Sequence, residues 1–388
     1  MFTVGQYKDS LAGLLTGTNL NNVTSLNGAI QRAARILAQL ADIPDSIVTQ
    51  NITVYDGVYK YEVNDTIFGG SLIDFRPQGT SRSPFDQVYK MPIQPWDMTK
   101  KLISNGASIS FEYDKGTPLI NISSARATLR AVIDPMNATD GWTAAGSASG
   151  LTLDETDYYD DNGSLRFTLT GASTGTLTKT VSSLSIASYE DVGVAFLAIK
   201  IPQGATASNL TSIAIRLGSS ATDYNEVSDT DGFLGAWVAG EWLLVALDFS
   251  TATQSGTPDW SALDYVQVRI THGATFTNFR VGGLWISLPS PYQLLYQSAA
   301  IFMASGANPS KSITTDNDQI VLGDAAYTIF EFLGAKVIAL QNSGGVYTNL
   351  IKGFDMMLEG AGAPKGLMGL YQADNPSQEE RTIDNYYG

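Results

Sequence analysis

Residues 192–201 read Val-Gly-Val-Ala-Phe-Leu-Ala-Ile-Lys-Ile, and residues 211–217 read Thr-Ser-Ile-Ala-Ile-Arg-Leu. Short apolar runs of this kind, bounded by Gly, Ser, Thr and Asp, predict β-strands. Similar runs recur at residues 165–169, 177–181, 242–249, 265–271 and 276–287. Strands at this spacing are typical of a β-sandwich, so we predict an all-β domain over residues 136–288.

The chain on either side of this domain has a different pattern. Apolar residues between Leu26 and Leu40 recur at three- and four-residue steps, which predicts an amphipathic helix over 25–41. Short alternating runs between residues 52 and 122 predict strands joined by hairpins, and residues 108–122 predict one such hairpin. Helices are expected again at 320–340 and 347–358, before a polar extended arm over 371–388.

We therefore predict an α+β protein. Residues 1–135 and 289–370 together would form a small helix-and-sheet core, into which the sandwich of residues 136–288 is inserted. Domain insertion requires chain ends that lie close together, which sandwiches commonly provide.

The predicted helix over 320–340 is apolar on nearly every face, so nearly every face must be covered. We expect neighbouring copies of the chain to supply part of this cover, and the alternative is a central helix wrapped within its own chain. The residues expected at the interface between copies are Ile320, Tyr327, Phe330, Leu333 and Val337.

Composition excludes several functions. The chain has 38 acidic residues against 23 Lys and Arg, for a formal net charge of −15. Nucleic acids and anionic membranes are bound through basic patches, so this balance argues against both as partners. Cysteine is absent, which excludes disulfides and thiolate metal sites. The first residues lack the basic and apolar regions of a secretory signal, so we expect folding in the cytoplasm.

Catalytic patterns are weak. His272 is the single histidine, and no second histidine or cysteine supports a metal site or a Ser–His triad. The many acids of the insertion fall in turn-like contexts, where no catalytic pair can be distinguished. We expect a protein that is not an enzyme and has no cofactor.

Two loop patterns of the insertion would allow it to bind calcium or a glycan. Asp154 and Asp157, and likewise Asp229 and Asp231, place carboxylates in flexible loops, where they would either hold structural calcium or stabilise solvated turns. Aromatic side chains in acidic loops would either contact a glycan or pack locally, and the best surface candidates are Tyr158, Tyr159 and Tyr224.

Several segments resemble proteins of tailed bacteriophages. Residues 26–35, Leu-Asn-Gly-Ala-Ile-Gln-Arg-Ala-Ala-Arg, and 54–61, Val-Tyr-Asp-Gly-Val-Tyr-Lys-Tyr, resemble the opening of head–tail connector and neck proteins. Residues 312–322 are similar to the lead-in of their long C-terminal helix. The insertion resembles the jelly-roll, carbohydrate-binding-module-like domains of virion proteins, at residues 141–142, 163–167, 215–219 and 255–259.

This resemblance implies a structural subunit of a virion, assembled in the host cytoplasm. The subunits would form an adaptor ring, commonly of twelve copies, between portal and tail or other neck proteins. Packaged DNA would pass through the ring without sequence-specific binding, and no membrane would be contacted. The alternative is a glycan- or receptor-binding virion decoration protein that acts through the jelly roll. A secreted carbohydrate-active enzyme is a further competitor, against which the N-terminus weighs.

Overall fold

The computed structural model describes residues 2–15, 25–40, 47–64, 67–78, 108–114, 117–123, 130–159, 162–298, 300–304, 309–341 and 352. The chain divides into two compact units. Unit 1 comprises Met1–Ile52, Lys60–Ser123 and Pro291–Gly388, and unit 2 comprises Thr53–Tyr59 and Ser124–Ser290. Among the described helices, none combines the length and apolarity needed to cross a bilayer.

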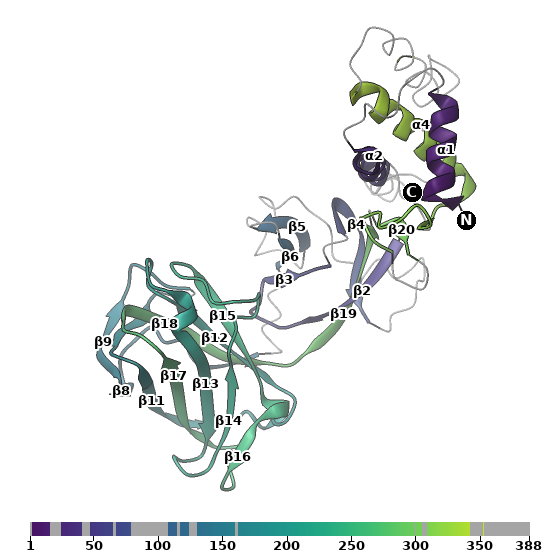
Figure 1. Cartoon of the computed structure of the whole chain (residues 1–388). Coiled ribbons are helices and arrows are strands. Elements are labelled where there is room, and N and C mark those ends of the chain that lie inside the picture. Colours follow the sequence, from purple (N-terminus) through teal and green to yellow (C-terminus); the bar gives the residue numbers. More distant parts are fainter. Residues whose placement is uncertain are drawn as a thin grey trace. The chain divides into compact units, whose positions relative to one another are not determined.

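Unit 2 is a β-sandwich of two six-stranded sheets, which confirms the predicted all-β domain (Figure 1). Sheet one has the order β15-β12-β18-β10-β9, and β7 also pairs with β18. Its strands are β7 (Arg130–Asp134), β9 (Ala148–Asp154), β10 (Ser164–Leu169), β12 (Val194–Lys200), β15 (Trp242–Asp248) and β18 (Phe276–Ser287).

Sheet two has the order β16-β14-β13-β17-β11-β8. Its strands are β8 (Thr143–Gly146), β11 (Ser173–Leu184), β13 (Leu210–Gly218), β14 (Tyr224–Asp229), β16 (Thr253–Ser255) and β17 (Leu263–His272). The strand pairs of both sheets are antiparallel. Side chains therefore alternate between the inter-sheet core and an outer face. The strand register then indicates which residues lie side by side on the outer face of each sheet.

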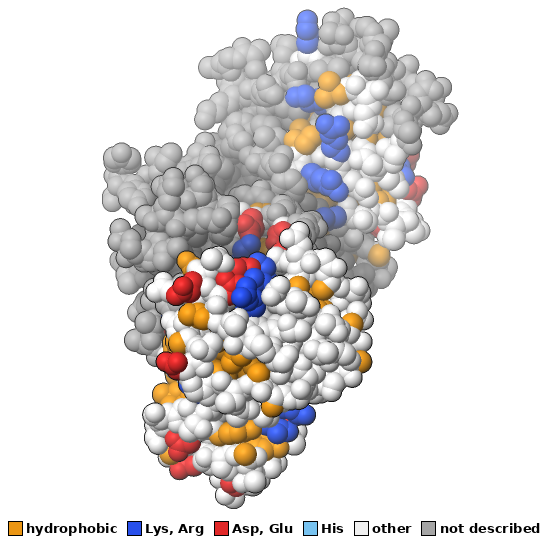
Figure 2. Space-filling model, turned by 90° about the vertical axis from the view of Figure 1, so that its left-hand side faces the viewer, with side chains coloured by type: hydrophobic (Ala, Val, Ile, Leu, Met, Phe, Trp, Pro, Cys, Tyr) orange, Lys and Arg blue, Asp and Glu red, His pale blue; other side chains and the backbone are white. Residues whose placement is uncertain are grey.

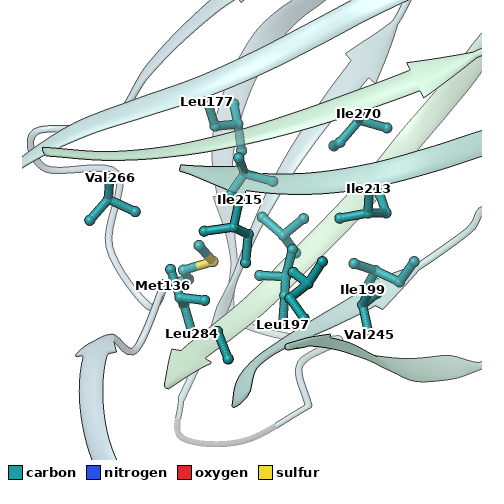
Figure 3. Packing of buried hydrophobic residues seen from close by; sticks show 14 of the residues in the cluster. Met136, Leu177, Leu197, Ile199, Ile213, Ile215, Val245, Val266, Ile270 and Leu284 are labelled. Atoms are coloured by element: carbon teal, nitrogen blue, oxygen red, sulfur yellow. The ribbon is translucent and has the colours of Figure 1, made fainter. Parts of the chain in front are cut away.

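The core of unit 2 lies between the sheets. Figure 3 shows Leu177, Ile213 and Ile215 of sheet two pointing toward Leu197 and Ile199 of sheet one. All five side chains are buried in one continuous apolar cluster. Burial of side chains of this size is worth about 1.5–3 kcal/mol each, which makes the sandwich a stable platform for its outer faces.

The boundaries of unit 2 differ from those predicted. Residues 124–135 and 53–59 were assigned to the helix-and-sheet core, but both segments belong to unit 2. The first contains β7, which pairs with β18. In the second, the Asp56 N–H donates to Ser287 Oγ at 2.9 Å, and the Tyr55 ring lies 5.1 Å from that of Phe196. Apolar and hydrogen-bonding contacts with sheet one thus place both segments in unit 2, although they lie outside the predicted range of 136–288.

Unit 1 contains three small sheets and three described helices. The sheets have the orders β1-β21-β20, β2-β19-β4 and β3-β6-β5. The bounds are β1 (Phe2–Thr3), β2 (Ile47–Val54), β3 (Lys60–Glu62), β4 (Ile67–Pro77), β5 (Ser108–Asp114), β6 (Thr117–Ser123), β19 (Ser290–Ser298), β20 (Phe302–Met303) and β21 (Gln319–Ile320). The helices are α1 (Val4–Leu14), α2 (Leu26–Leu40) and α4 (Asp324–Gln341). The predicted helix over 25–41 and the hairpin over 108–122 are confirmed, whereas 347–358 and 371–388 lie outside the described residues, apart from residue 352.

The apolar C-terminal helix is shorter at its start than predicted. Ile320 lies in β21, and α4 begins at Asp324, where the Tyr327 N–H donates to the Gly323 carbonyl. The sequence did not predict α1, whose N-cap Thr3 forms a capping box with Gln6. This missed helix packs on α4, because the buried Tyr7 hydroxyl donates to the Phe330 carbonyl at 2.6 Å.

The five residues expected at an interface between copies are buried within the chain. Each of the five is covered by its own chain, with exposed fractions of 0–5%. The physical reason is that α1, α2 and the first sheet supply the cover for α4 that the sequence assigned to neighbouring copies. The residues concerned are Ile320, Tyr327, Phe330, Leu333 and Val337.

Candidate functional site

The outer face of sheet two carries a polar and aromatic surface. Along β17, Val266, Val268 and Ile270 are buried in the core, so the alternate residues Tyr265, Gln267 and Arg269 lie on the opposite face. These three side chains are partly exposed. The pattern within one strand therefore supplies an aromatic ring, an amide and a guanidinium to one surface.

Neighbouring strands continue this surface as a row across the sheet. Gln267 of β17 lies opposite Thr178 of β11 on one side and opposite Arg216 of β13 on the other. Arg216 in turn lies opposite Glu226 of β14. Gln267 Nε2 donates to Thr178 Oγ1 at 2.9 Å, and Arg216 Nη1 donates to Gln267 Oε1 at 3.3 Å. The row is thus a continuous hydrogen-bonded chain over four strands.

Glu226 binds two arginines at once. Arg216 Nε donates to Glu226 Oε2, and Arg269 Nη1 donates to Glu226 Oε1 at 2.5 Å. The side chains of Arg216, Arg269 and Glu226 keep 22%, 32% and 23% of their surface exposed. Burial acts to lower the pKa of Arg216, but the bond with Glu226 outweighs it, so the pKa is raised and the group stays charged.

Two tyrosines adjoin this network. Tyr265 of β17 and Tyr224 of β14 both lie opposite Gly218, the last residue of β13. Their ring centroids are 6.4 Å apart, with planes inclined at 38°. The guanidinium carbon of Arg216 lies 4.3 Å from the centre of the Tyr224 ring, within cation–π range. Hereafter the tyrosine–arginine face denotes Tyr224, Tyr265, Arg216, Arg269, Glu226 and Gln267.

Gly218 allows the rings to approach each other. A Cβ at this position would lie 2.0 Å from the Asp223 carbonyl oxygen and 2.5 Å from the Tyr224 Cα. Both are backbone atoms, which cannot move aside as the end of a flexible side chain could. The β13–β14 turn therefore closes onto a residue without a side chain, and this places Tyr224 beside Tyr265.

The tyrosine–arginine face combines what a saccharide requires. A pyranose ring has flat faces of C–H groups, which pack on aromatic rings, and hydroxyl edges, which need both donors and acceptors. Here two partly exposed rings lie beside guanidinium donors, an amide and a carboxylate whose positions are fixed by mutual hydrogen bonds.

Asp154 and Asp157, the first predicted calcium ligands, lie instead beside cationic side chains. Asp154 Oδ2 accepts from Arg280 Nε at 2.9 Å and from Arg280 Nη2 at 2.8 Å. Asp157 Oδ1 accepts from Lys200 Nζ at 2.9 Å and from Trp242 Nε1 at 2.9 Å. A calcium ion at either carboxylate would have to displace a positive group that the protein itself supplies.

The titration of Asp154 reflects this setting. The hydrogen bond from the Thr156 hydroxyl, together with those from Arg280, holds the pKa of Asp154 well below its usual range. In the view of Figure 2 the charged side chains on the surface of the sandwich are sparse. Asp154 itself is 5% exposed, so its ion pair with Arg280 is a structural one.

The second predicted calcium pair forms a turn. Asp229 Oδ1 accepts from the N–H groups of Thr230 and Asp231, at 2.6 and 3.2 Å. Short acids commonly stabilise turns in this way. Within the described ranges, no group of three or more His, Cys, Asp or Glu side chains is placed to hold a metal ion.

The three tyrosines predicted for glycan contact lie in different surroundings. Tyr224 belongs to the tyrosine–arginine face. Tyr159 packs on sheet one, where its ring stacks on Trp285 with centroids 6.4 Å apart. Tyr158, in the same loop as Tyr159, is 44% exposed. The structure therefore does not bring the loop tyrosines together with Tyr224.

His272 is buried and bonded at both ring nitrogens. Nδ1 lies 2.7 Å from the Ala274 carbonyl oxygen, and Nε2 lies 2.6 Å from Ser147 Oγ. Since a carbonyl only accepts, Nδ1 carries the proton and the Ser147 hydroxyl donates to Nε2 when the ring is neutral. His272 thus ties the β8–β9 turn to the end of β17.

Most of the tyrosine–arginine face was not predicted. Only Tyr224 was predicted, because glycan contact was expected at aromatic residues in acidic loops. The signal for the others is the alternation in residues 265–269, Tyr-Val-Gln-Val-Arg, which places three polar or aromatic side chains on one face. The pairing of Arg216 with Glu226 depends on strand register, which the sequence does not specify.

No protein-family model and no curated protein matches the sequence. Among solved structures, the chain is similar in part to carbohydrate-binding modules. A family 11 module from Clostridium thermocellum, in complex with a β-1,3-1,4-mixed-linked tetrasaccharide, is 12% identical, with coverage of 41% of this chain and 95% of that chain and a TM-score of 0.30.

Two further modules give similar values. A family 30 module is 13% identical, covering 41% of this chain and 99% of that chain, with a TM-score of 0.33. TmCBM61, in complex with β-1,4-galactotriose, is 8% identical, covering 39% of this chain and 91% of that chain, with a TM-score of 0.26. The β-sandwich of unit 2 is established independently of these values, by its own strand order and core.

Proposed function

We propose that the chain binds a glycan through the tyrosine–arginine face of unit 2. The observation that carries the proposal is the placement of Tyr224 and Tyr265 with ring centroids 6.4 Å apart, beside the hydrogen-bonded network of Arg216, Glu226 and Arg269. The rings offer apolar faces to the C–H surface of a sugar. The network offers donors and an acceptor to its hydroxyl groups, already fixed in position before the ligand arrives.

The strand framework supports this function. Hydrogen-bonded strands hold the side chains of this face, so a ligand would not have to order a loop in order to bind. The partly exposed side chains of this face come from β13, β14 and β17, with the apolar core directly beneath. Binding without chemistry fits the expectation that the chain is not an enzyme, which stays a prediction.

A glycan microarray probed with the full chain tests the proposal. We expect binding to a restricted set of saccharides, and loss of that binding in a Tyr224→Ala/Tyr265→Ala variant. Each aromatic contact is worth about 0.5–1.5 kcal/mol beyond its buried area, so the double variant should bind about tenfold more weakly or worse. Tyr158→Ala is the matched control, because it removes an exposed tyrosine elsewhere on the sandwich.

The result that contradicts the proposal is equally specific. If the wild-type chain binds no saccharide on the array, or if Tyr158→Ala reduces binding while the double variant does not, the tyrosine–arginine face is not the glycan site. We expect each variant to keep the fold, because both tyrosines lie on an outer face. Circular dichroism and the melting temperature of each variant check this.

The virion role expected from the sequence is a separate prediction. Its support is the resemblance of residues 26–35, 54–61 and 312–322 to head–tail connector proteins. A ring of copies would need an interface other than the five buried residues of α4 and β21. Mass measurement of the purified chain, alone and with portal or other neck proteins, tests the ring and these partners together. Detection of the chain in purified virions tests its location.

A further inference from the structure

The charge of the tyrosine–arginine face is opposite to that of the surrounding sequence. Residues 136–288 contain 16 acids and 6 bases. In the described cross-strand rows of this face, by contrast, the two positive groups Arg216 and Arg269 are accompanied by one acid, Glu226. A local excess of one positive charge therefore lies within a strongly acidic segment.

Glu226 is the acid that pairs with the two arginines of this face. Both carboxylate oxygens of Glu226 are already engaged, Oε2 by Arg216 and Oε1 by Arg269. The acids that flank the two tyrosines in sequence accept hydrogen bonds from other groups: Asp223 accepts from the Ser220 hydroxyl at 2.6 Å, and Asp264 accepts from the Ser183 N–H at 2.7 Å. Two guanidinium groups therefore share one carboxylate within these rows, and Glu226 balances one of their two charges.

Arg269 is the residue best placed to meet a ligand. It lies opposite Ala214 of β13, a small residue that is 6% exposed, and its side chain crosses β13 to reach Glu226. Within the described part of the chain, only its Nη1 makes a hydrogen bond. A guanidinium has five N–H donors in a planar fork, so the Nε and Nη2 donors remain for a carboxylate, which accepts two parallel bonds.

We propose that the ligand of this face is an acidic saccharide, whose carboxylate is bound by Arg269 while its rings lie against Tyr224 and Tyr265. The proposal rests on the glycan-binding function proposed above and adds the chemical class of the ligand. The six-residue face has a hydroxyl-rich margin, in which Thr174 Oγ1 and Thr271 Oγ1 lie 3.2 Å apart. A uronic acid polymer presents both a carboxylate and free hydroxyls at each sugar, and so satisfies both features.

The test compares polymers that differ only in the availability of the carboxylate. Polygalacturonate, alginate and hyaluronan are each offered to the full chain beside their methyl esters, in which the same backbone carries no charge. We expect at least one acid form to bind about tenfold or more tightly than its ester, as charge-assisted bonds to a guanidinium predict. The preference should weaken as salt is raised, because the pair is partly exposed.

Two variants should change the binding of the acid form in opposite directions. Arg269→Gln should reduce the preference for the acid form over its ester to less than about threefold, because the charge-assisted bond to the carboxylate is lost. Glu226→Gln should raise affinity for the acid form, since it removes the competing carboxylate and keeps an acceptor of the same size. Arg166→Gln is the matched control, since it lies on sheet one with 40% of its side chain exposed.

The outcomes separate this inference from the function on which it rests. If esters or neutral glycans bind as tightly as the acid forms, the ligand is not acidic. If Arg269→Gln keeps the full preference, the carboxylate is not bound by Arg269. Either result overturns this proposal and leaves glycan binding standing. If no glycan of any charge binds the wild-type chain, both proposals fail.

Discussion

The guanidinium carbon of Arg216 lies 4.3 Å from the centre of the Tyr224 ring, and the same guanidinium donates to Glu226 and to Gln267. Arg216 therefore connects the ring that would stack on a sugar with the groups that would bind its hydroxyls. A change of Arg216 should alter the position of the ring and of the hydrogen-bonding groups.

Arg216→Lys tests this coupling. Lysine keeps the positive charge but loses the planar fork that bonds Glu226 and Gln267 while covering the Tyr224 ring. We expect about tenfold weaker glycan binding, measured by affinity electrophoresis or calorimetry. Arg166→Lys on sheet one, 3.7 Å from Asp154, should leave affinity unchanged. Full affinity in Arg216→Lys would mean that charge alone is what the face requires.

Gly218→Ala tests the close approach of the two tyrosines. The new Cβ would overlap backbone atoms of Asp223 and Tyr224, so we expect the free energy of unfolding to fall by about 2 kcal/mol or more. Glycan affinity should fall as well, because Tyr224 must move. Gly273→Ala is the control, since its Cβ would meet no atom closer than 3.8 Å. Equal melting temperatures for the two variants would contradict the geometry described here.

Calcium removal should leave the sandwich unaffected. Arg280 and Lys200 already neutralise the carboxylates of Asp154 and Asp157, so an ion has no uncompensated pair to bind there. We expect the same melting temperature in excess chelator and in millimolar calcium. A rise of several degrees with calcium would contradict this account of the two aspartates, since ligands that bind only the folded state stabilise it.

Tyr7 of α1 packs against Gly334 of α4. A Cβ on Gly334 would lie 2.2 Å from Tyr7 Oη, and the Tyr7 hydroxyl is bonded to the Phe330 carbonyl. We expect Gly334→Ala to destabilise the chain by about 2–3 kcal/mol and Tyr7→Phe by about 1 kcal/mol. In the double variant part of the overlap is relieved, so the two losses should sum to more than the double variant shows. Strict additivity, measured by urea unfolding, would argue against the contact.

Asp318 should make stability depend on acid pH. Burial alone would raise its pKa, but hydrogen bonds from Thr314 and Thr315 lower the pKa to about 2. A carboxylate with a lowered pKa stabilises the fold fully above its unfolded pKa of about 3.9, and this contribution is lost as pH falls toward about 2. Asp318→Asn should therefore cost about 2 kcal/mol at pH 7 and progressively less below about pH 4.

The control for this prediction is Asp316→Asn, whose exposed carboxylate pairs with Lys8 at the surface and should contribute little. Urea unfolding of the wild type and both variants at pH 7 and pH 3 gives the comparison. A difference between wild type and Asp318→Asn that is the same at both values would rule out the proposed linkage.

The sequence predicted what depends on local pattern. Alternation and turn residues marked the strands of unit 2, and the three- and four-residue period marked α2, since both signals are contained within one segment. Helix α1 was not predicted, although its buried residues Val4, Tyr7 and Leu11 recur at three- and four-residue steps. Its identity depends on Tyr7 and Leu11 packing on α4, more than 300 positions away.

The candidate site depended on longer-range information. Asp154 and Asp157 resembled calcium ligands because their loop is acidic, but Arg280, 126 positions along the chain from Asp154, decides their role. Tyr224 was named from its loop, whereas its partner Tyr265 became visible only once strand register placed both opposite Gly218. Register couples distant segments, and a single sequence does not determine which residues face one another.

The most direct test of the central claim is a crystal structure of the full chain with a bound oligosaccharide, taken from the tightest ligand on the glycan array. The account predicts sugar density against the rings of Tyr224 and Tyr265, with hydroxyl or carboxylate groups at Arg216 and Arg269. Density for the sugar on sheet one, or anywhere on unit 1, with the tyrosine–arginine face left bare, would contradict it.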